Sequence, residues 1–192
     1  NRGGRPPRIE PAPPEEPACA DGRLVPADPD KPFDILPLIR RFADMNSMLE
    51  LKELYAREAV TALARVEGRA VGIVANNSKN KGGILFPETC EKISRFISIC
   101  DAFGIPMLFL ADNPGFIIGT AAERAGIIKS ASLLFTTIAN AQTPRLLIVA
   151  RRAHTAGLYA MSGPGFDPAQ FLALPTAAIS VFGRRALDRF SA

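Results

Sequence analysis

The stretch at residues 105–120, IPMLFLADNPGFIIGT, constrains the fold more than any other part of the chain. It begins with a run at 107–111 that is apolar throughout, which is typical of a strand buried on both faces of a parallel sheet. The Pro-Gly pair at 114–115 ends this run, and a long helical pattern follows Gly119. Ligands bind beside the carboxyl ends of parallel strands, and helix N-termini offer free N–H groups. The segment therefore predicts a binding loop, although an ordinary strand-to-helix connection would have the same pattern.

Composition and charge narrow the class of protein. The chain has 192 residues, of which 47% are hydrophobic, enough to form a core. No run approaches about 18 apolar residues, so we expect no membrane span. The net charge of +4 is mild and scattered, so we expect no nucleic-acid partner. Cys19, Cys90 and Cys100 lack metal-like spacing, and no apolar leader is present, which predicts reduced thiols in the cytoplasm, with the mitochondrial matrix as the alternative.

The start of the chain differs from the rest in its proline content. Residues 1–32 hold nine of the seventeen prolines and show little apolar periodicity. They are predicted to form an extended arm or linker, and we expect residues 1–25 to pack little against the core. Residues 33–192 would then form the folded domain. A short amphipathic helix is expected at 34–42, with Asp34 as its N-cap.

Strand and helix patterns alternate through the rest of the chain. Strands are expected at 48–54, 60–66, 70–75, 107–111, 146–150 and 177–182, and helices at 88–103 and 121–140, with 67–69 as a hairpin turn. The apolar stripe of the first helix is Ile93, Phe96, Ile97 and Cys100, with Lys92, Arg95 and Asp101 outside it; that of the second is Ile127, Ile128, Leu134, Phe135 and Ile138. This order predicts an α/β fold with right-handed crossovers.

The common catalytic sets are missing. His154 is the only histidine, so a histidine-based metal cluster is excluded, and we interpret it as a loop or packing residue. The sequence has no nucleophile elbow and no glycine-rich phosphate loop. Asp112 and Glu123 lie eleven residues apart across a loop, and Glu123 is better explained as a helix-start residue, so we do not interpret them as an acid/base pair. The remaining candidates are backbone N–H groups in the loops at 112–120 and 155–161, which could form an oxyanion hole; alternatively, the small residues there only permit close packing.

Several of these segments together resemble one enzyme family. They are VGIVANN at 71–77, residues 92–96, the stretch at 105–134, HTAGLYAMSG at 154–163 and PTAAISVFG at 175–183. The pattern D-x-P-G-F-x-x-G-x-x-x-E-x-x-G-I-I-K falls on Asp112, Pro114, Gly115, Phe116, Gly119, Glu123, Gly126, Ile127, Ile128 and Lys129. Over residues 30–183 the chain resembles the C-terminal half of the carboxyltransferase β-subunits of biotin-dependent acyl-CoA carboxylases, the propionyl-, methylcrotonyl- and acetyl-CoA types.

The resemblance implies a crotonase-like (ClpP/crotonase) ββα superhelix and a site without metal. In this family the C-terminal half binds N-carboxybiotin and stabilises its ureido oxyanion through two backbone N–H groups, which fall here on Ala156 and Gly157. The biotin pocket would be shaped by Pro114, Gly115, Phe116, Gly119 and Thr155. His154 departs from the family, which often has tyrosine or phenylalanine at that position.

The resemblance also implies a reaction and partners. The carboxyl group would move from N-carboxybiotin, held on a separate carrier domain, to the α-carbon of an acyl-CoA, with no side chain acting as base. The implied partners are an N-terminal carboxyltransferase half, a biotin carboxyl carrier protein and biotin carboxylase, in a homo- or hetero-oligomer. Without the N-terminal half the chain is expected to be inactive. A biotin-dependent acyl-CoA decarboxylase subunit and a non-catalytic assembly module remain alternatives, whereas a crotonase-type hydratase would need paired carboxylates that we do not find.

Overall fold

The computed structural model describes residues 6–15, 24–28 and 30–181. In this part of the chain a seven-stranded sheet has the order β1-β2-β3-β4-β5-β6, and β7 also pairs with β5. The strands are β1 Leu49–Glu50, β2 Ala59–Val66, β3 Arg69–Asn76, β4 Met107–Asn113, β5 Arg145–His154, β6 Gln170–Ala173 and β7 Ala178–Ser180. The helices are α1 Leu36–Arg40, α2 Pro87–Ala102, α3 Thr120–Arg124, α4 Ile127–Asn140 and α5 Ala156–Ala160, with short 3-10 turns η1 Lys81–Gly83 and η2 Pro164–Phe166.

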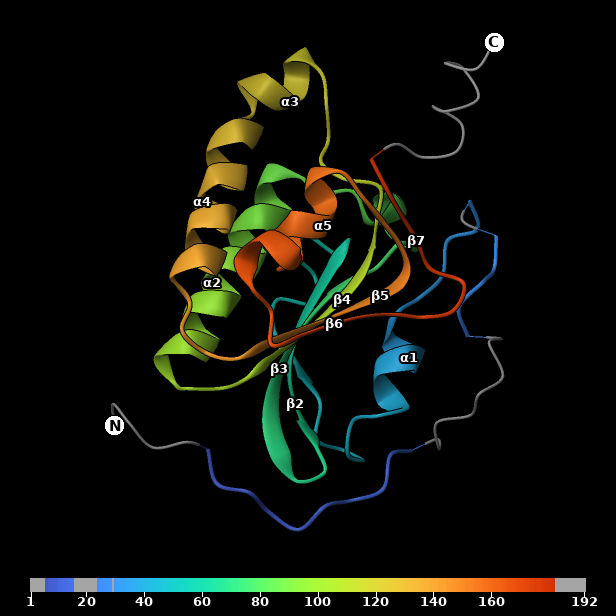
Figure 1. The fold of residues 1–192 in the computed structure, drawn as a ribbon, viewed down its shortest axis with the longest axis vertical. Helices are drawn as coiled ribbons and strands as arrows, with labels where there is room; N and C mark the ends of the chain where they lie inside the picture. The colour runs from blue at the N-terminus through green and yellow to red at the C-terminus, as the bar shows by residue number, and fades with distance from the viewer. Residues whose placement is uncertain (1–5, 16–23, 29, 182–192) are drawn as a thin grey trace.

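Helices cover both faces of the sheet. The pair α2 and α4 packs on one face and α1 on the other (Figure 1). Along β4 the side chains alternate between the two layers: Phe109 belongs to the core under α2 and α4, whereas Leu108 and Leu110 belong to the core under α1. Strands β3, β4 and β5 run parallel to one another, and all of β4 is buried. The buried parallel strands predicted from the apolar runs are therefore confirmed.

The predicted hairpin forms between β2 and β3, but its turn is shorter than expected. Only Glu67 and Gly68 lie outside the strands, and both have positive φ values, 50° and 74°, as a two-residue hairpin turn requires.

The N-terminal arm crosses this turn, where the Ile9 N–H donates to the Gly68 carbonyl at 3.0 Å. A Cβ at Gly68 would lie 2.0 Å from the Ile9 carbonyl oxygen, so the crossing requires glycine.

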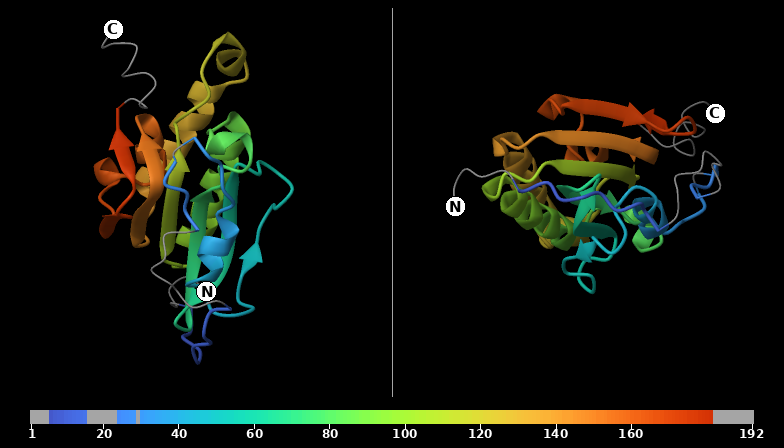
Figure 2. Two further views of the ribbon diagram at one scale, coloured as in Figure 1. Left: turned by 90° about the vertical axis from the view of Figure 1, so that its right-hand side faces the viewer. Right: turned by 90° about the horizontal axis from the view of Figure 1, so that it is seen from below.

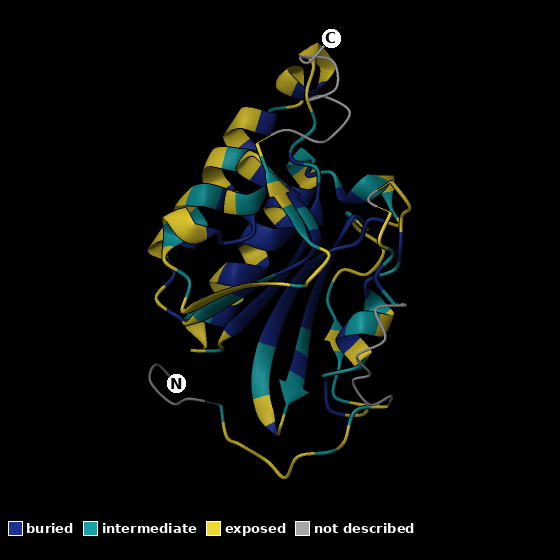
Figure 3. Ribbon diagram, turned by 45° about the vertical axis from the view of Figure 1, so that its right-hand side comes forward, coloured by how far each residue is buried: buried dark blue, intermediate teal, exposed yellow. Residues whose placement is uncertain are grey.

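The arm has two parts that differ in burial. Residues 6–15 are mostly exposed (Figure 3), as expected for a segment that packs little against the core. By contrast, Val25 is only 7% exposed and belongs to the core under α1, which corrects that expectation at its last residue. Asp34 accepts a hydrogen bond from the Leu36 N–H at 3.1 Å, although Ile35 rather than Asp34 occupies the N-cap of α1.

Some predicted elements are wrong in extent, and one strand was not predicted. The strand expected at 48–54 shrinks to β1 because the backbone turns at Lys52 and Ala56, where φ is 56° and 45°. The helix expected at 121–140 is split into α3 and α4 by Gly126, whose φ is 85°. As a result, Ile128 points to solvent and is 74% exposed. Strand β6 was not predicted, and it lies with β7 toward one side of the sheet (Figure 2).

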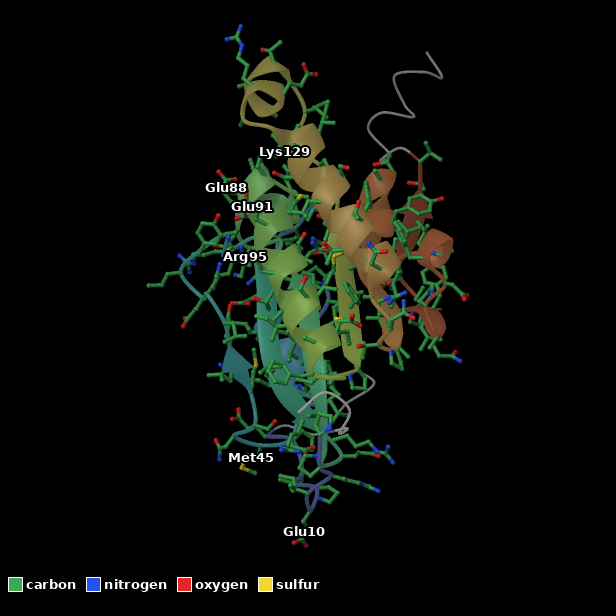
Figure 4. The ribbon with its side chains drawn as sticks, turned by 90° about the vertical axis from the view of Figure 1, so that its left-hand side faces the viewer. Glu10, Met45, Glu88, Glu91, Arg95 and Lys129 are labelled. Atoms are coloured by element: carbon green, nitrogen blue, oxygen red, sulfur yellow. The ribbon has the colours of Figure 1, made fainter. Side chains whose placement is uncertain are left out.

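Lys92 is buried, contrary to the helical pattern that placed it outside the apolar stripe of α2. The residue is 1% exposed, and its Nζ donates to the carbonyl oxygens of Tyr55 at 2.8 Å and Ala59 at 2.7 Å. Burial lowers the pKa of its ammonium group. One turn further along, Arg95 is exposed on α2 (Figure 4), as predicted.

Burial also decides the state of the thiols. Cys90 and Cys100 on α2 are buried and free, and desolvation raises the pKa of each thiol to about 12. Both therefore stay protonated and unreactive at neutral pH. Cys19 lies outside the described residues.

Candidate active site

The two loops predicted to carry chemistry meet at the carboxyl ends of β4 and β5. These strands are parallel neighbours, and Asn113 at the end of β4 pairs with Ala153 near the end of β5. After β4 the chain passes through residues 114–119 to α3, and after β5 it turns at Thr155 into α5. The first loop is tied down by Leu85, whose N–H donates to the Gly115 carbonyl at 3.0 Å.

Glycines allow the two loops to touch. A Cβ at Gly157 would lie 1.9 Å from Asn113 Oδ1 and 2.9 Å from Gly115 Cα, so no other residue fits there without movement. Gly115 has a φ of 118°, and a Cβ on it would lie 3.1 Å from Thr155 Oγ1. The structure thus brings Gly115, Thr155 and Gly157 of the predicted site into contact.

The start of α5 presents two backbone donors. Ala156 and Gly157 are its first two residues, so their N–H groups have no acceptor within the helix. The preceding Thr155 has φ 49° and ψ −137°, a conformation that costs a non-glycine residue about 1–3 kcal/mol. Its N–H donates to the Ser180 carbonyl of β7 at 3.1 Å, which helps to hold this turn. The backbone is therefore fixed in a strained geometry where the donors begin.

An apolar groove of about 540 Å³ opens beside these donors. Its lining residues are Phe116, Ile117, Ile118, Gly119, Glu123, Ile127, Ile128, Ala131, Ser132, Phe135, Thr136 and Ala156. Three of the predicted site residues line the groove: Phe116, Gly119 and Ala156. The other predicted site residues do not line it: Pro114, Gly115, Thr155 and Gly157. One wall is aromatic, with the Phe116 and Phe135 rings edge to face at 5.8 Å between centroids. A volume of this size suits a small organic ligand.

Asp112 forms a buried ion pair and does not line the groove. Its carboxylate is completely buried and accepts two hydrogen bonds from Arg151, from Nε at 3.0 Å and from Nη2 at 2.9 Å. Arg152 Nε lies 3.3 Å from the same carboxylate. Among the described residues, Glu123 is the one charged residue that lines the groove, so the two acids do not form a pair, in agreement with the sequence interpretation.

Arg151 extends this ion pair to the N-terminal arm. Its Nη1 donates to the carbonyl oxygens of Asp28, at 3.1 Å, and of Lys31. Its Nη2 also donates to Ser78 Oγ at 3.1 Å. The guanidinium group lies over the Phe33 ring, 5.1 Å from its centroid. All the hydrogen-bonding nitrogens of Arg151 are therefore in use, on the side of the strands away from the groove.

His154 packs against β7. Its Nδ1 lies 2.9 Å from Ser180 Oγ, and it does not line the groove. Burial, and then the positive charge of Arg152, lowers the pKa of the imidazole, so the ring is neutral at pH 7. A neutral imidazole turned away from the groove fits a packing role.

The described residues contain neither a metal-binding cluster nor a membrane-spanning helix. In residues 6–15, 24–28 and 30–181, no three histidine, cysteine, aspartate or glutamate side chains lie close enough together to hold a metal ion. Over the same ranges, no helix has the length and apolar character needed to cross a membrane.

Residues 1–187 match the sequence model of the carboxyl transferase domain. The chain belongs to this family. Among relatives, the uncharacterized carboxylase YngE of Bacillus subtilis is 50% identical over 163 residues, 85% of the chain and 32% of the relative. The biotin-dependent 3-methylcrotonyl-coenzyme A carboxylase beta1 subunit of Mycobacterium tuberculosis is 40% identical over 160 residues, 83% of the chain and 29% of the relative. The chain thus spans about a third of the length of these relatives.

Solved structures of the family share the fold of this carboxyl transferase domain. Transcarboxylase 12S, solved with methylmalonyl-coenzyme A bound and described as a hexamer assembly, superposes with a TM-score of 0.93 at 32% identity, over 100% of the chain and 37% of that protein. The geranyl-CoA carboxylase beta subunit of P. aeruginosa gives 0.84 at 34% identity, over 97% of the chain and 35% of that protein. The predicted resemblance and the crotonase-like α/β fold class are confirmed.

The sequence interpretation of this carboxyl transferase domain missed one residue that joins the loops. Asn113 lies directly before the Pro-Gly pair that predicts the turn, yet its side chain contacts both Gly115 and Gly157. An asparagine before Pro-Gly is a known turn initiator, so the turn was predictable. The contact with α5 was not, because it depends on the register of two strands.

Proposed function

We propose that this carboxyl transferase domain is the carboxybiotin-binding half of a site that moves a carboxyl group from N-carboxybiotin to the α-carbon of an acyl-CoA. One observation carries the proposal: Ala156 lines an apolar groove and, with Gly157, begins a helix whose first N–H groups have no internal acceptor. The biotin-dependent carboxylases among the relatives support the choice of substrates.

The groove suits the biotin head group. Fused rings of low polarity fit its apolar walls, where Phe116 and Gly119 lie, and the urea oxygen would accept from the two N–H groups. Gly115 and Thr155 touch behind these residues, and Pro114 leads into their loop, so all three would shape the pocket indirectly.

Each part of the chain would have a defined role in the transfer. When bound, carboxybiotin would supply the carboxyl group and, after its loss, the base for the α-proton. The Ala156 and Gly157 N–H groups would hold the negative charge that develops on the urea oxygen, and one such donor is typically worth about 3 kcal/mol of transition-state stabilisation. The apolar walls would exclude water. No side chain of this chain needs to act as base, which agrees with a groove whose one charged residue is Glu123.

The proposed partners complete the site. An N-terminal carboxyltransferase half would hold the acyl-CoA, a biotin carboxyl carrier protein would deliver the biotin, and biotin carboxylase would load it. The chain corresponds to about a third of its relatives, so we propose that alone it does not turn over acyl-CoA. The hexamer assembly of transcarboxylase 12S supports an oligomer.

A backbone donor is best tested by proline, which lacks the N–H. Proline at Gly157 would also place a Cβ against Asn113, so its effect would mix two causes. Ala156 is exposed and is the first residue of α5, a position where helices accept proline. In the assembled enzyme, Ala156→Pro should lower the kcat of carboxyl transfer by about a hundredfold or more.

Ala156→Ser keeps the N–H and serves as the matched control, with circular dichroism to verify folding of both variants. Full transfer activity in a folded Ala156→Pro enzyme would refute the oxyanion role. An assembled wild-type enzyme that moves no carboxyl group in either direction would instead support an assembly module.

A further inference from the structure

We propose that Asn113 is the positioning residue that sets the place of the Ala156 and Gly157 donors, by fixing the loop after β4 against the start of α5. This inference rests on the proposed function and adds to it a side chain that acts through the backbone. Asn113 does not line the groove, so it would not touch biotin.

The side chain of Asn113 makes contacts in three directions. It is completely buried, at the last position of β4. Its Oδ1 accepts a hydrogen bond from the Gly115 N–H at 3.0 Å, and its Nδ2 donates to Asn76 Oδ1 at 2.8 Å. Nδ2 also lies 3.5 Å from the Gly157 carbonyl oxygen. The amide group is therefore shared by β3, the loop after β4, and α5.

Asn76 supports this amide group from behind. It ends β3, is completely buried, and its Oδ1 also accepts from the Asp112 N–H at 3.2 Å. One oxygen thus receives two donors from the end of β4. Since Asp112 is itself held by Arg151 at 2.9 Å, the end of β4 is fixed on both sides, and Asn113 has little freedom to move.

Contact with α5 is direct. The position of a Cβ on Gly157 lies only 1.9 Å from Asn113 Oδ1, so the Gly157 Cα rests against the Asn113 amide. A change in that amide would let the start of α5 shift, and a misplacement of about 1 Å in an active site can cost about a hundredfold in rate. An amide also fixes the loop without adding negative charge beside donors that must hold a developing anion.

The test uses this domain assembled with its N-terminal carboxyltransferase half, the biotin carrier and biotin carboxylase, and measures kcat and the KM for acyl-CoA. Asn113→Ala should lower kcat about ten- to a hundredfold and leave KM within about twofold. Asn113→Ser should recover part of the loss, because a serine hydroxyl can form the same turn to Gly115 more weakly. Asn113→Asp, which has nearly the same shape, should be impaired because it lacks the donor and adds charge.

Thr61→Val is the control for loss of a buried hydrogen bond elsewhere. Thr61 is 1% exposed and its Oγ1 donates to the Leu51 carbonyl at 2.9 Å, on β2. This variant should keep the wild-type kcat.

Unchanged kcat in Asn113→Ala and Asn113→Ser would overturn the positioning role, as would a loss equal to that of Thr61→Val. If Ala156→Pro were also fully active, the oxyanion role of the donors would be refuted as well, and if the assembled wild-type enzyme moved no carboxyl group, the proposed function itself would fail; if Ala156→Pro alone were inactive, only the role of Asn113 would be refuted. Should Asn113→Ala not fold, Asn113→Ser and Asn113→Asp decide between these outcomes.

Discussion

Replacing Lys92 by methionine keeps an apolar chain of similar length but removes every hydrogen bond of the ammonium group. The carbonyl oxygens of Tyr55 and Ala59 would lose donors at 2.8 and 2.7 Å. A buried acceptor left without a partner costs about 1–3 kcal/mol, which makes about 2–6 kcal/mol for two. Part of this is offset because methionine has no charge to desolvate, the effect that lowers the pKa of Lys92.

We therefore expect Lys92→Met to lower the free energy of unfolding by about 2–4 kcal/mol. For a chain of this size, about 3 kcal/mol corresponds to a fall in Tm of about 6–12 °C. Urea denaturation followed by far-UV circular dichroism measures the change. Arg95→Met is the matched control, because Arg95 is exposed on the same helix, and it should stay within about 0.5 kcal/mol of wild type. Equal stability of the two variants would refute the reasoning.

Two further predictions concern the turn that begins α5. Because the pKa of His154 is lowered in the folded state, the unfolded chain, with an imidazole pKa of about 6.5, binds its proton first as pH falls. Stability should decline from pH 7 to pH 5, and His154→Phe should decline less; equal changes in Tm would contradict the lowered pKa. Thr155→Gly should raise the free energy of unfolding by about 1 kcal/mol in the same urea assay, since relief of about 1–3 kcal/mol of strain exceeds the entropy cost of glycine. A destabilised variant would show that the Thr155 side chain contributes more than its backbone costs.

Sequence patterns predicted the buried sheet because burial on both faces leaves an unbroken apolar run. The run at 107–111 forms the first part of β4, and the one at 146–150 lies in the first half of β5. The apolar pattern did not predict the end of a helix where a single backbone angle sets it. The apolar period continues through Gly126, so it cannot show that φ changes sign there and turns Ile128 outward.

The burial of Lys92 and the contacts of Asn113 were not predicted for a different reason. Each binds groups that are distant in sequence: the acceptors of Lys92 lie more than thirty residues earlier, and Asn113 meets Gly157 across 44 positions. The period of a helix or strand reports only which face a residue occupies. The loops at 112–120 and 155–161 were predicted as a pair because parallel strands place their carboxyl ends together, and β4 and β5 do so.

The bonds of Arg151 also impose an order on the assembly of the chain during synthesis. Asp112 leaves the ribosome 39 residues before Arg151, and the Asp28 carbonyl 123 residues before it. Until β5 is made, the Asp112 carboxylate lacks the two arginines that pair with it, so burial of this end of β4 would leave an uncompensated charge. Asp28 and Lys31 gain their bonds to Arg151 only after β5 is made, whereas the contact of Ile9 with Gly68 needs no residue of β5. A nascent chain stalled before residue 151 would therefore leave the Asp112 carboxylate and these two carbonyl groups without their partner.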